Sequence, residues 1–184
     1  FVDIAGLVKG ASKGEGLGNK FLSHIREVDA VVHLVRCFKN DNIQHVNNLI
    51  DPVSDLEIIK TEIILSDIDL IQKKLEKSKK KTLSPKELDL LQSALKNLNE
   101  GKEITFLNGE NYKFFNTIGM LSIKPKIIVC NVDEQSLSTG NEYTKAIQQR
   151  FTNEKIISIC ADIEDQLSSL DKNEKENFMK EIGL

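Results

Sequence analysis

The sequence predicts an α/β protein: a mostly parallel sheet flanked by helices, with an antiparallel helical hairpin inserted between two strands. Two observations support this fold class. Short apolar runs rich in β-branched residues alternate with helical patterns, as is typical of parallel sheets that are covered on both faces. From 55 to 99 the strand pattern disappears, and apolar residues recur instead with helical spacing.

The elements of the sheet follow from these runs. Each expected strand is a nearly continuous apolar segment, and the expected helices lie between and after them. The expected strands are Ala30–Phe38, Lys126–Asn131 and Ile156–Ala161, with Phe1–Asp3 as the end of a fourth. The expected helices are Asn19–Glu27, Glu142–Phe151 and Asn173–Ile182.

The hairpin is predicted from two apolar seams with alternating steps of three and four residues. They comprise Ile64, Ile68, Ile71 and Leu75, then Leu88, Leu91, Leu95 and Leu98. Ser84 and Glu87 form a capping-box pattern at the start of the second helix, and Gly101 offers a left-handed stop. We therefore expect a coiled-coil insertion at 55–120, between a partial nucleotide-binding domain at 1–54 and its remainder at 121–184.

Composition sets limits on the function. The 184 residues carry a net charge of −3 and are 40% hydrophobic, which suits one ordinary globular core and gives no electrostatic sign of sequence-specific DNA binding. No apolar run approaches the length of a membrane span, so we expect a cytoplasmic protein without membrane association. The three cysteines lack metal-ligand spacing and are expected to be buried thiols.

Three polar motifs follow three expected strands: "DIAG" from Asp3 to Gly6, "NVDE" from Asn131 to Glu134, and "CADIE" from Cys160 to Glu164. In a parallel sheet the carboxyl ends of the strands share one edge, where ligands bind. Each motif alone is a weak signal, since an Asp commonly caps a turn and a Gly commonly supplies positive φ. Their order, however, matches a P-loop nucleotide hydrolase of the translation-factor type.

The same residues resemble a known family. The stretches "FVDIAGLVKGASKGEGLGNKFLSHIREVDAVVHLVRCF", "DPVSDLEIIKTEIILSDID" and "KPKIIVCNVDE" are similar to the YchF-type Obg-like ATPases. The resemblance covers essentially the whole chain. It implies a P-loop NTPase-type domain with a coiled-coil insertion, which binds ATP with Mg2+ and associates with the ribosome or ribosomal RNA.

In the light of this resemblance, the tetrad that begins at Asn131 indicates which nucleotide base the protein binds. Guanine-specific relatives use Asn-Lys-x-Asp, whereas this chain has Val132 in place of the lysine and the longer Glu134 in place of the aspartate. A site built for guanine leaves polar groups unpaired against adenine, so the altered tetrad favours ATP. Val132 would present main-chain groups to the base, Asn131 would hold the loop, and Cys160 and Ala161 would close over the base.

Other roles follow the family pattern. Asp3 would hold Mg2+ through water, and the N–H of Gly6 would reach the γ-phosphate. Leu7 stands where related enzymes have the glutamine that orients water. The chain contains no Gly-x-x-x-x-Gly-Lys-Ser/Thr motif, which the family would place before Phe1, and the C-terminal TGS domain of the family has no counterpart here.

The sequence therefore predicts that this chain itself binds nucleotide weakly and is inactive, while the full-length protein is an ATPase. Two alternatives stay open: a guanine-specific Obg-type GTPase and a non-enzymatic helical adaptor.

Overall fold

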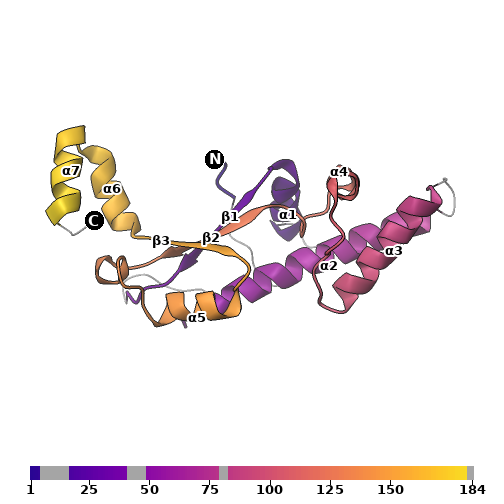
Figure 1. Cartoon of the computed structure of the whole chain (residues 1–184), viewed down its shortest axis with the longest axis horizontal. Helices are drawn as coiled ribbons and strands as arrows, with labels where there is room; N and C mark the ends of the chain where they lie inside the picture. Colours follow the sequence, from indigo (N-terminus) through magenta and orange to yellow (C-terminus); the bar gives the residue numbers. More distant parts are fainter. Residues whose placement is uncertain (5–16, 41–48, 79–82, 182–184) are drawn as a thin grey trace. The chain divides into compact units, whose positions relative to one another are not determined.

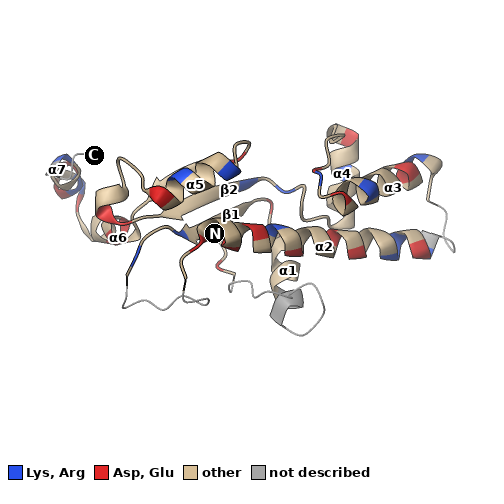
Figure 2. Ribbon diagram, turned by 90° about the horizontal axis from the view of Figure 1, so that it is seen from below, with Lys and Arg blue, Asp and Glu red and all other residues tan. Residues whose placement is uncertain are grey.

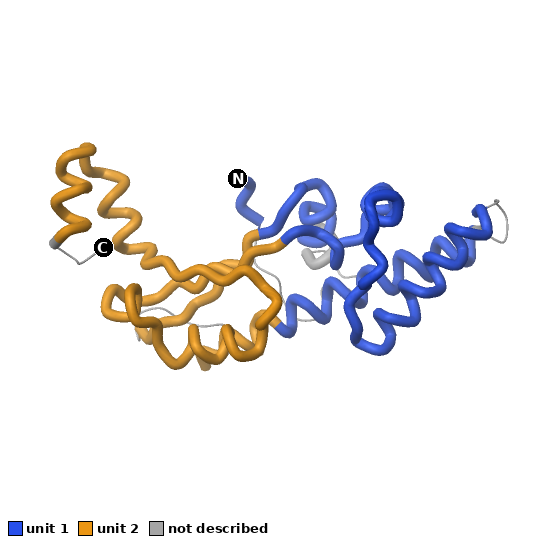
Figure 3. The backbone as a smooth tube through the Cα atoms, viewed as in Figure 1, with its two compact units in different colours: residues 1–31, 57–125 blue, residues 32–56, 126–184 orange. Residues whose placement is uncertain are grey.

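The computed structural model describes residues 1–4, 17–40, 49–78 and 83–181 (Figure 1). Its elements in chain order are α1 (Leu17–Glu27), β1 (Val31–Arg36), α2 (Pro52–Ser78), α3 (Pro85–Asn99), α4 (Gly109–Ile118), β2 (Lys126–Asn131), the 3-10 turn η2 (Glu134–Ser136), α5 (Glu142–Arg150), β3 (Lys155–Ile159), α6 (Ala161–Ser169) and α7 (Lys172–Glu181). They form two compact units (Figure 3). Unit 1 comprises Phe1–Val31 and Glu57–Pro125, and unit 2 comprises Val32–Leu56 and Lys126–Leu184.

The sheet has three strands in the order β1-β2-β3. β2 and β3 are parallel, with Ile127 opposite Lys155 and Asn131 opposite Ile159. β1 runs parallel to β2 as well: the N–H of Val31 donates to the carbonyl of Pro125, and the N–H of Cys37 donates to that of Asn131, with the same offset. The parallel α/β sheet predicted from the sequence is thus confirmed.

Unit 2 has its own core on one face of this sheet. Alternate residues of the strands meet apolar residues of α5, because successive side chains of a strand point to opposite faces. The buried members are Val35, Cys37, Leu56, Ile128, Cys130, Val132, Ile147 and Phe151. An ion pair between Lys126 and Glu154, 2.8 Å long and largely shielded, joins the first residue of β2 to the residue before β3.

From Glu57 onward the helical hairpin lies in unit 1, and in Figures 1 and 2 α3 runs back beside α2. Ser84 and Glu87 form the predicted capping box, and Gly101 has the left-handed φ of +69° expected of a helix stop. We call α2, α3, α4 and the segment up to Ile123 the arm. Most of the predicted seam lies in its core cluster, but Leu88 is 37% exposed.

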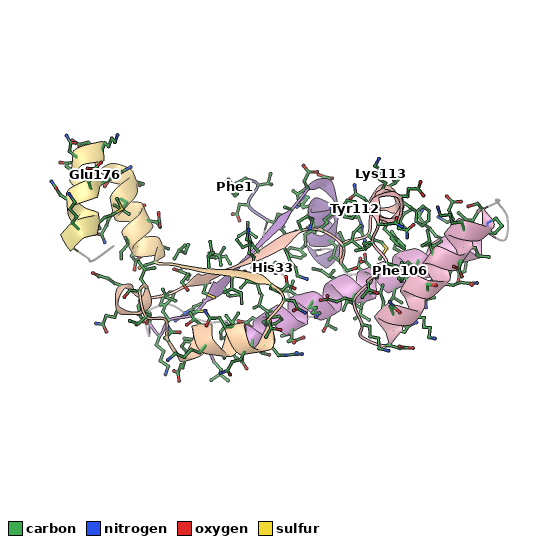
Figure 4. The ribbon with its side chains drawn as sticks, in the orientation of Figure 1. Phe1, His33, Phe106, Tyr112, Lys113 and Glu176 are labelled. Atoms are coloured by element: carbon green, nitrogen blue, oxygen red, sulfur yellow. The ribbon has the colours of Figure 1, made fainter. Side chains whose placement is uncertain are left out.

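The arm core contains more than the two predicted seams. Helix α4 and the residues around it add Ile104, Phe115, Met120 and Ile123 to the buried cluster. Phe106 and Tyr112, labelled in Figure 4, pack against the cluster, and the ring of Phe115 lies 6.1 Å from that of Phe106. The second seam is therefore covered by a layer of aromatic side chains as well as by α2.

The structure differs from the expected elements in four places. Phe1–Asp3 is not a strand: Phe1 and Val2 are exposed, so their apolar side chains do not form the buried end of a strand. β3 ends at Ile159, and Ala161 already begins α6. Neither α4 nor α6 is predicted from the sequence.

Charges of both signs alternate along the described part of the hairpin (Figure 2). Lys73 forms an ion pair of 2.7 Å with Asp69, one turn earlier on α2. The sequence from Lys73 to Lys81 is rich in lysine, and its last residues, 79–81, lie outside the described residues. Among the described residues, none of the helices combines the length and the hydropathy of a membrane-spanning segment.

Candidate nucleotide site

Asn131, the last residue of β2, links two of the motifs found in the sequence. Its side-chain Oδ1 accepts a hydrogen bond of 3.0 Å from the N–H of Ala161, the first residue of α6. The first N–H groups of a helix have no partner within the helix, so this bond satisfies one of them. Asn131 thus ties the carboxyl end of β2 to the segment after β3.

Val132 is oriented inward. Its side chain is 2% exposed and belongs to the core of unit 2, while its N–H donates to the carbonyl of Ile159 at 2.8 Å. The N–H is therefore used by the sheet. Of the main-chain groups expected to face a base, the carbonyl oxygen is the one that this bond leaves available.

The two acidic residues that follow have different surroundings. The carboxylate of Asp133 accepts the N–H of Ser136 at 2.9 Å and caps η2, so it has a structural partner. Glu134 is exposed at the start of η2. Of this pair, Glu134 is better placed to accept hydrogen bonds from a ligand.

Cys160 and Ala161 lie at the junction of β3 and α6. Cys160 is 3% exposed and occupies the N-cap position without a side-chain hydrogen bond to the helix, and Ala161 is exposed. The predicted closing segment is thus the first turn of a helix rather than an extension of the strand. Together with Asn131 and Val132 it forms one continuous edge of unit 2.

Asn141 also holds this edge, a role that was not predicted from the sequence. Its Nδ2 donates to the carbonyl of Cys37, just after β1, at 2.7 Å. Its Oδ1 accepts the N–H groups of Tyr143 and Thr144 and so caps α5. The Asn-x-x-Thr spacing indicates a helix cap in the sequence. The bond to Cys37 joins residues 104 positions apart, so the local sequence does not predict it.

Two thiols lie beneath the edge. Cys37 and Cys130 are fully buried, and all three cysteines are free, as expected from the sequence. A hydrogen bond to Cys130, together with burial, raises the pKa of Cys37 well above its usual range. Cys37 therefore stays a neutral thiol and contributes packing to the edge.

The first motif lies in unit 1. Asp3 is exposed, so its carboxylate is available to a hydrated cation, and Gly6 and Leu7 lie outside the described residues. Among the described residues no group of three His, Cys, Asp or Glu side chains could enclose a metal ion. A single carboxylate is compatible with Mg2+ held mainly by phosphate and water, and the role expected of Asp3 stays a prediction.

The parallel sheet and its polar carboxyl edge are features of the P-loop nucleotide hydrolase class. A family model described as "50S ribosome-binding GTPase" matches residues 1–100, so the chain belongs to this family.

Comparison with individual proteins identifies a narrower group of relatives. Over all of its length the chain is 43% identical to the ribosome-binding ATPase YchF of Mycoplasma pneumoniae and 39% identical to that of Bacillus subtilis, and it covers 54% and 53% of those proteins. The solved structure of the Schizosaccharomyces pombe YchF GTPase superposes on 95% of the chain with a TM-score of 0.80 and 29% identity, and 51% of that protein is covered. The resemblance to the YchF-type proteins is confirmed, and the chain spans about half the length of these relatives.

Proposed function

We propose that the protein to which this chain belongs is a cytoplasmic, ribosome-linked switch that binds and hydrolyses ATP. The observation that carries this proposal is the tetrad from Asn131 to Glu134, which lies at the carboxyl edge of β2 and is joined through Asn131 to the start of α6. Relatives named ribosome-binding ATPases support both the ligand and the partner.

The preference for ATP rests on the chemistry of the tetrad. Guanine recognition uses the aspartate of Asn-Lys-x-Asp to accept two hydrogen bonds, and the lysine to cover the ring. Val132 is buried and cannot replace that lysine, and Glu134 places its carboxylate one methylene further out. A site built to accept the N1 proton and the 2-amino group of guanine leaves polar groups unpaired against adenine, which has an amino group at position 6 and no N1 proton, so the altered tetrad favours ATP. The Schizosaccharomyces pombe relative is named a GTPase, which keeps GTP as the second candidate.

The phosphate side of the site involves the first motif. Asp3 would hold Mg2+ through water, and the N–H of Gly6 would meet the γ-phosphate; bound Mg2+ supplies charge neutralisation for phosphoryl transfer. Leu7 cannot orient water, so we expect slow intrinsic hydrolysis. Single-turnover hydrolysis rates of the longer protein test this expectation, and Leu7→Gln should raise the rate. A wild-type rate that is already fast, together with an equal rate in Leu7→Gln, would refute it.

This chain alone is expected to bind ATP weakly and to be inactive. No Gly-x-x-x-x-Gly-Lys-Ser/Thr sequence occurs in its 184 residues, so the amide cradle and the phosphate-binding lysine are not supplied by them. Calorimetry on the chain and on the longer protein tests this directly. Tight binding of MgATP by the chain alone would contradict it.

Base recognition is tested with Glu134→Ala in the longer protein and with Gln135→Ala, its exposed neighbour on η2, as the matched control. Loss of a hydrogen bond to a charged group should weaken ATP binding about tenfold for Glu134→Ala, with no change for Gln135→Ala. Tighter binding of GTP than of ATP would favour the GTPase. Binding of neither nucleotide would favour a helical adaptor.

A further inference from the structure

The connection from β2 to α5, residues 131–141, carries the tetrad, and both of its ends meet Cys37 (Figure 1). We call this connection the tetrad loop. The N–H of Cys37 donates to the carbonyl of Asn131 at 2.7 Å, and the carbonyl of Cys37 accepts Nδ2 of Asn141 at 2.7 Å. Cys37 directly follows β1 and is fully buried. One buried residue therefore binds the first and the last residue of the loop through its backbone.

The side-chain amide of Asn141 has two separate tasks. Its Oδ1 accepts the N–H groups of Tyr143 and Thr144, at 3.0 and 3.1 Å, and so caps α5. Its Nδ2 satisfies the carbonyl of Cys37, which is costly to leave unpaired in a buried position. The cap needs only an acceptor, whereas the bond to Cys37 needs a donor. A substitution can therefore remove the second task and keep the first.

The first end of the loop is held from two sides. The carbonyl of Asn131 accepts the Cys37 N–H on the side of β1, and its Oδ1 accepts the N–H of Ala161 on the side of α6. At the other end, the bond from Asn141 ties the loop to β1. Cys37 thus joins the two ends of the loop at the carboxyl edge of the sheet.

Between its ends the loop is bonded to itself. The N–H groups of Ser136 and Leu137 donate to the carbonyls of Asp133 and Glu134 at 3.1 and 3.2 Å, and the N–H of Gly140 donates to the carbonyl of Ser136 at 2.8 Å. Leu137 packs against the core of unit 2, but apolar contact is not directional. The direction in which the loop presents Glu134 therefore depends on the hydrogen bonds at its two ends.

We infer that Asn141 is a positioning residue for base recognition: its bond to Cys37 fixes the tetrad loop, and so places the carboxylate of Glu134 for the adenine base. A binding group has to be held within about 0.5 Å of its place, by residues that are themselves fixed by hydrogen bonds. A loop that is tied to β1 at one end only does not meet this requirement. The inference rests on the proposed function, because it concerns the same nucleotide site.

The test compares two substitutions in the longer protein. Asn141→Ser keeps the cap of α5, because serine caps helices about as well as asparagine does, but its side chain is too short to reach Cys37. Thr144→Val is the matched control. It removes the hydroxyl that accepts the N–H of Asn141 at 2.8 Å, and so weakens the same cap without touching the bond to Cys37. The dissociation constant of MgATP is measured for each.

We expect Asn141→Ser to weaken ATP binding about fivefold, and Thr144→Val to change it less than about twofold. Because Asn141 acts through Glu134, Asn141→Ser should cost no further affinity when it is added to Glu134→Ala. A merely structural role would instead give losses that add. Wild-type affinity in Asn141→Ser, an equal loss in Thr144→Val, or additive losses in the double variant would each overturn the inference.

Hydrogen exchange without nucleotide separates this inference from the proposed function. Asn141→Ser should speed exchange at Ser136, Leu137 and Gly140, whereas Thr144→Val should speed exchange in α5 only. If ATP binds but Asn141→Ser leaves exchange in the loop unaltered, the inference is overturned and the proposed function stands. If neither ATP nor GTP binds to the longer protein, the proposed function fails, and the exchange comparison still decides whether Asn141 fixes the loop.

Discussion

Asp67 fixes a chain reversal through a single buried side chain. Its two carboxylate oxygens accept the N–H groups of Leu121 and Ser122, 54 and 55 positions away. Asp67→Asn replaces one acceptor with a donor, which leaves an N–H unpaired. We expect the free energy of unfolding at pH 7 to fall by about 1–3 kcal/mol, measured by urea titration.

The matched control is Asp69→Asn, two positions further along α2. Asp69 is exposed and pairs with Lys73 at 2.7 Å, and such surface pairs contribute little, so this substitution should cost about 0.5 kcal/mol or less. Equal losses in the two variants would show that the buried hydrogen bonds of Asp67 have no special weight.

The stability supplied by Asp67 should also depend on pH. Burial raises the pKa of this carboxyl from its ordinary 3.8, and the hydrogen bonds from Leu121 and Ser122 and the charge of Arg26 only partly oppose this. An acid with a raised pKa holds its proton more tightly in the folded state, so its contribution is complete below 3.8 and is lost as pH rises through the folded-state pKa. The difference in stability between wild type and Asp67→Asn should therefore grow on acidification from pH 7 towards 4. A difference that shrinks would contradict the direction of the shift.

Single residues were predictable where their partners are local. Ser84 and Glu87 are three positions apart, and the burial of the cysteines follows from the apolar runs that contain them. The ammonium group of Lys124 donates to the carbonyl of Arg26 at 3.1 Å, and neither residue carries such a signal, because they meet only when distant segments fold together, and a lone charged residue is usually a solvated one. Asn131 was found because its motif stands at the end of a strand.

At the scale of the element, the start of α3 can be tested. Oγ of Ser84 accepts the N–H of Glu87, and the Glu87 carboxylate accepts the Ser84 N–H and O–H. Ser84→Ala should destabilise the protein by about 0.5–2 kcal/mol in thermal or urea unfolding. Ser93→Ala, inside the same helix, should be neutral or slightly stabilising because alanine is the better helix former.

The same hydrogen bonds lower the pKa of Glu87 from its ordinary 4.5. The stabilisation that they give is therefore present above pH 4.5 and is lost as pH falls through the folded-state pKa. The effect of Ser84→Ala should diminish on acidification. An effect that is unchanged when Glu87 is protonated would assign the whole cap to the serine hydroxyl.

Elements were predicted well where their periodicity was regular. The two seams predicted both long helices of the hairpin, and β-branched runs predicted the three strands. Helix α4 was missed because its sequence, from Gly109 to Ile118, is rich in aromatic residues and Asn, which have modest helix propensity. The burial of Phe115 in the arm core and the caps at Asn108 and Gly119 supply what propensity does not.

At the scale of the whole molecule, the compact units cut across the chain differently from the predicted segments. The division into 1–54, 55–120 and 121–184 follows the order of motifs and stays a prediction. The units follow packing: α1 clusters with the arm, and β1 clusters with the strands that come after the arm. Sequence order does not carry this information, because it depends on which apolar faces meet.

Each unit has buried clusters made only of its own residues, and this predicts separate local stabilities. Leu91 is fully buried in the arm core, and Ile147 is fully buried in the core beneath the sheet. Leu91→Ala and Ile147→Ala should each cost about 2–5 kcal/mol. Hydrogen exchange measures this, because local opening follows cooperative units. Leu91→Ala should speed exchange in α2, α3 and α4 and leave β2, β3 and α5 unchanged. Ile147→Ala should speed exchange in β2, β3 and α5 and leave α2, α3 and α4 unchanged.

If either variant fails to fold, Leu91→Met and Ile147→Val give the same comparison at a lower cost in stability. Faster exchange throughout the chain in both variants would show that the two cores unfold as one.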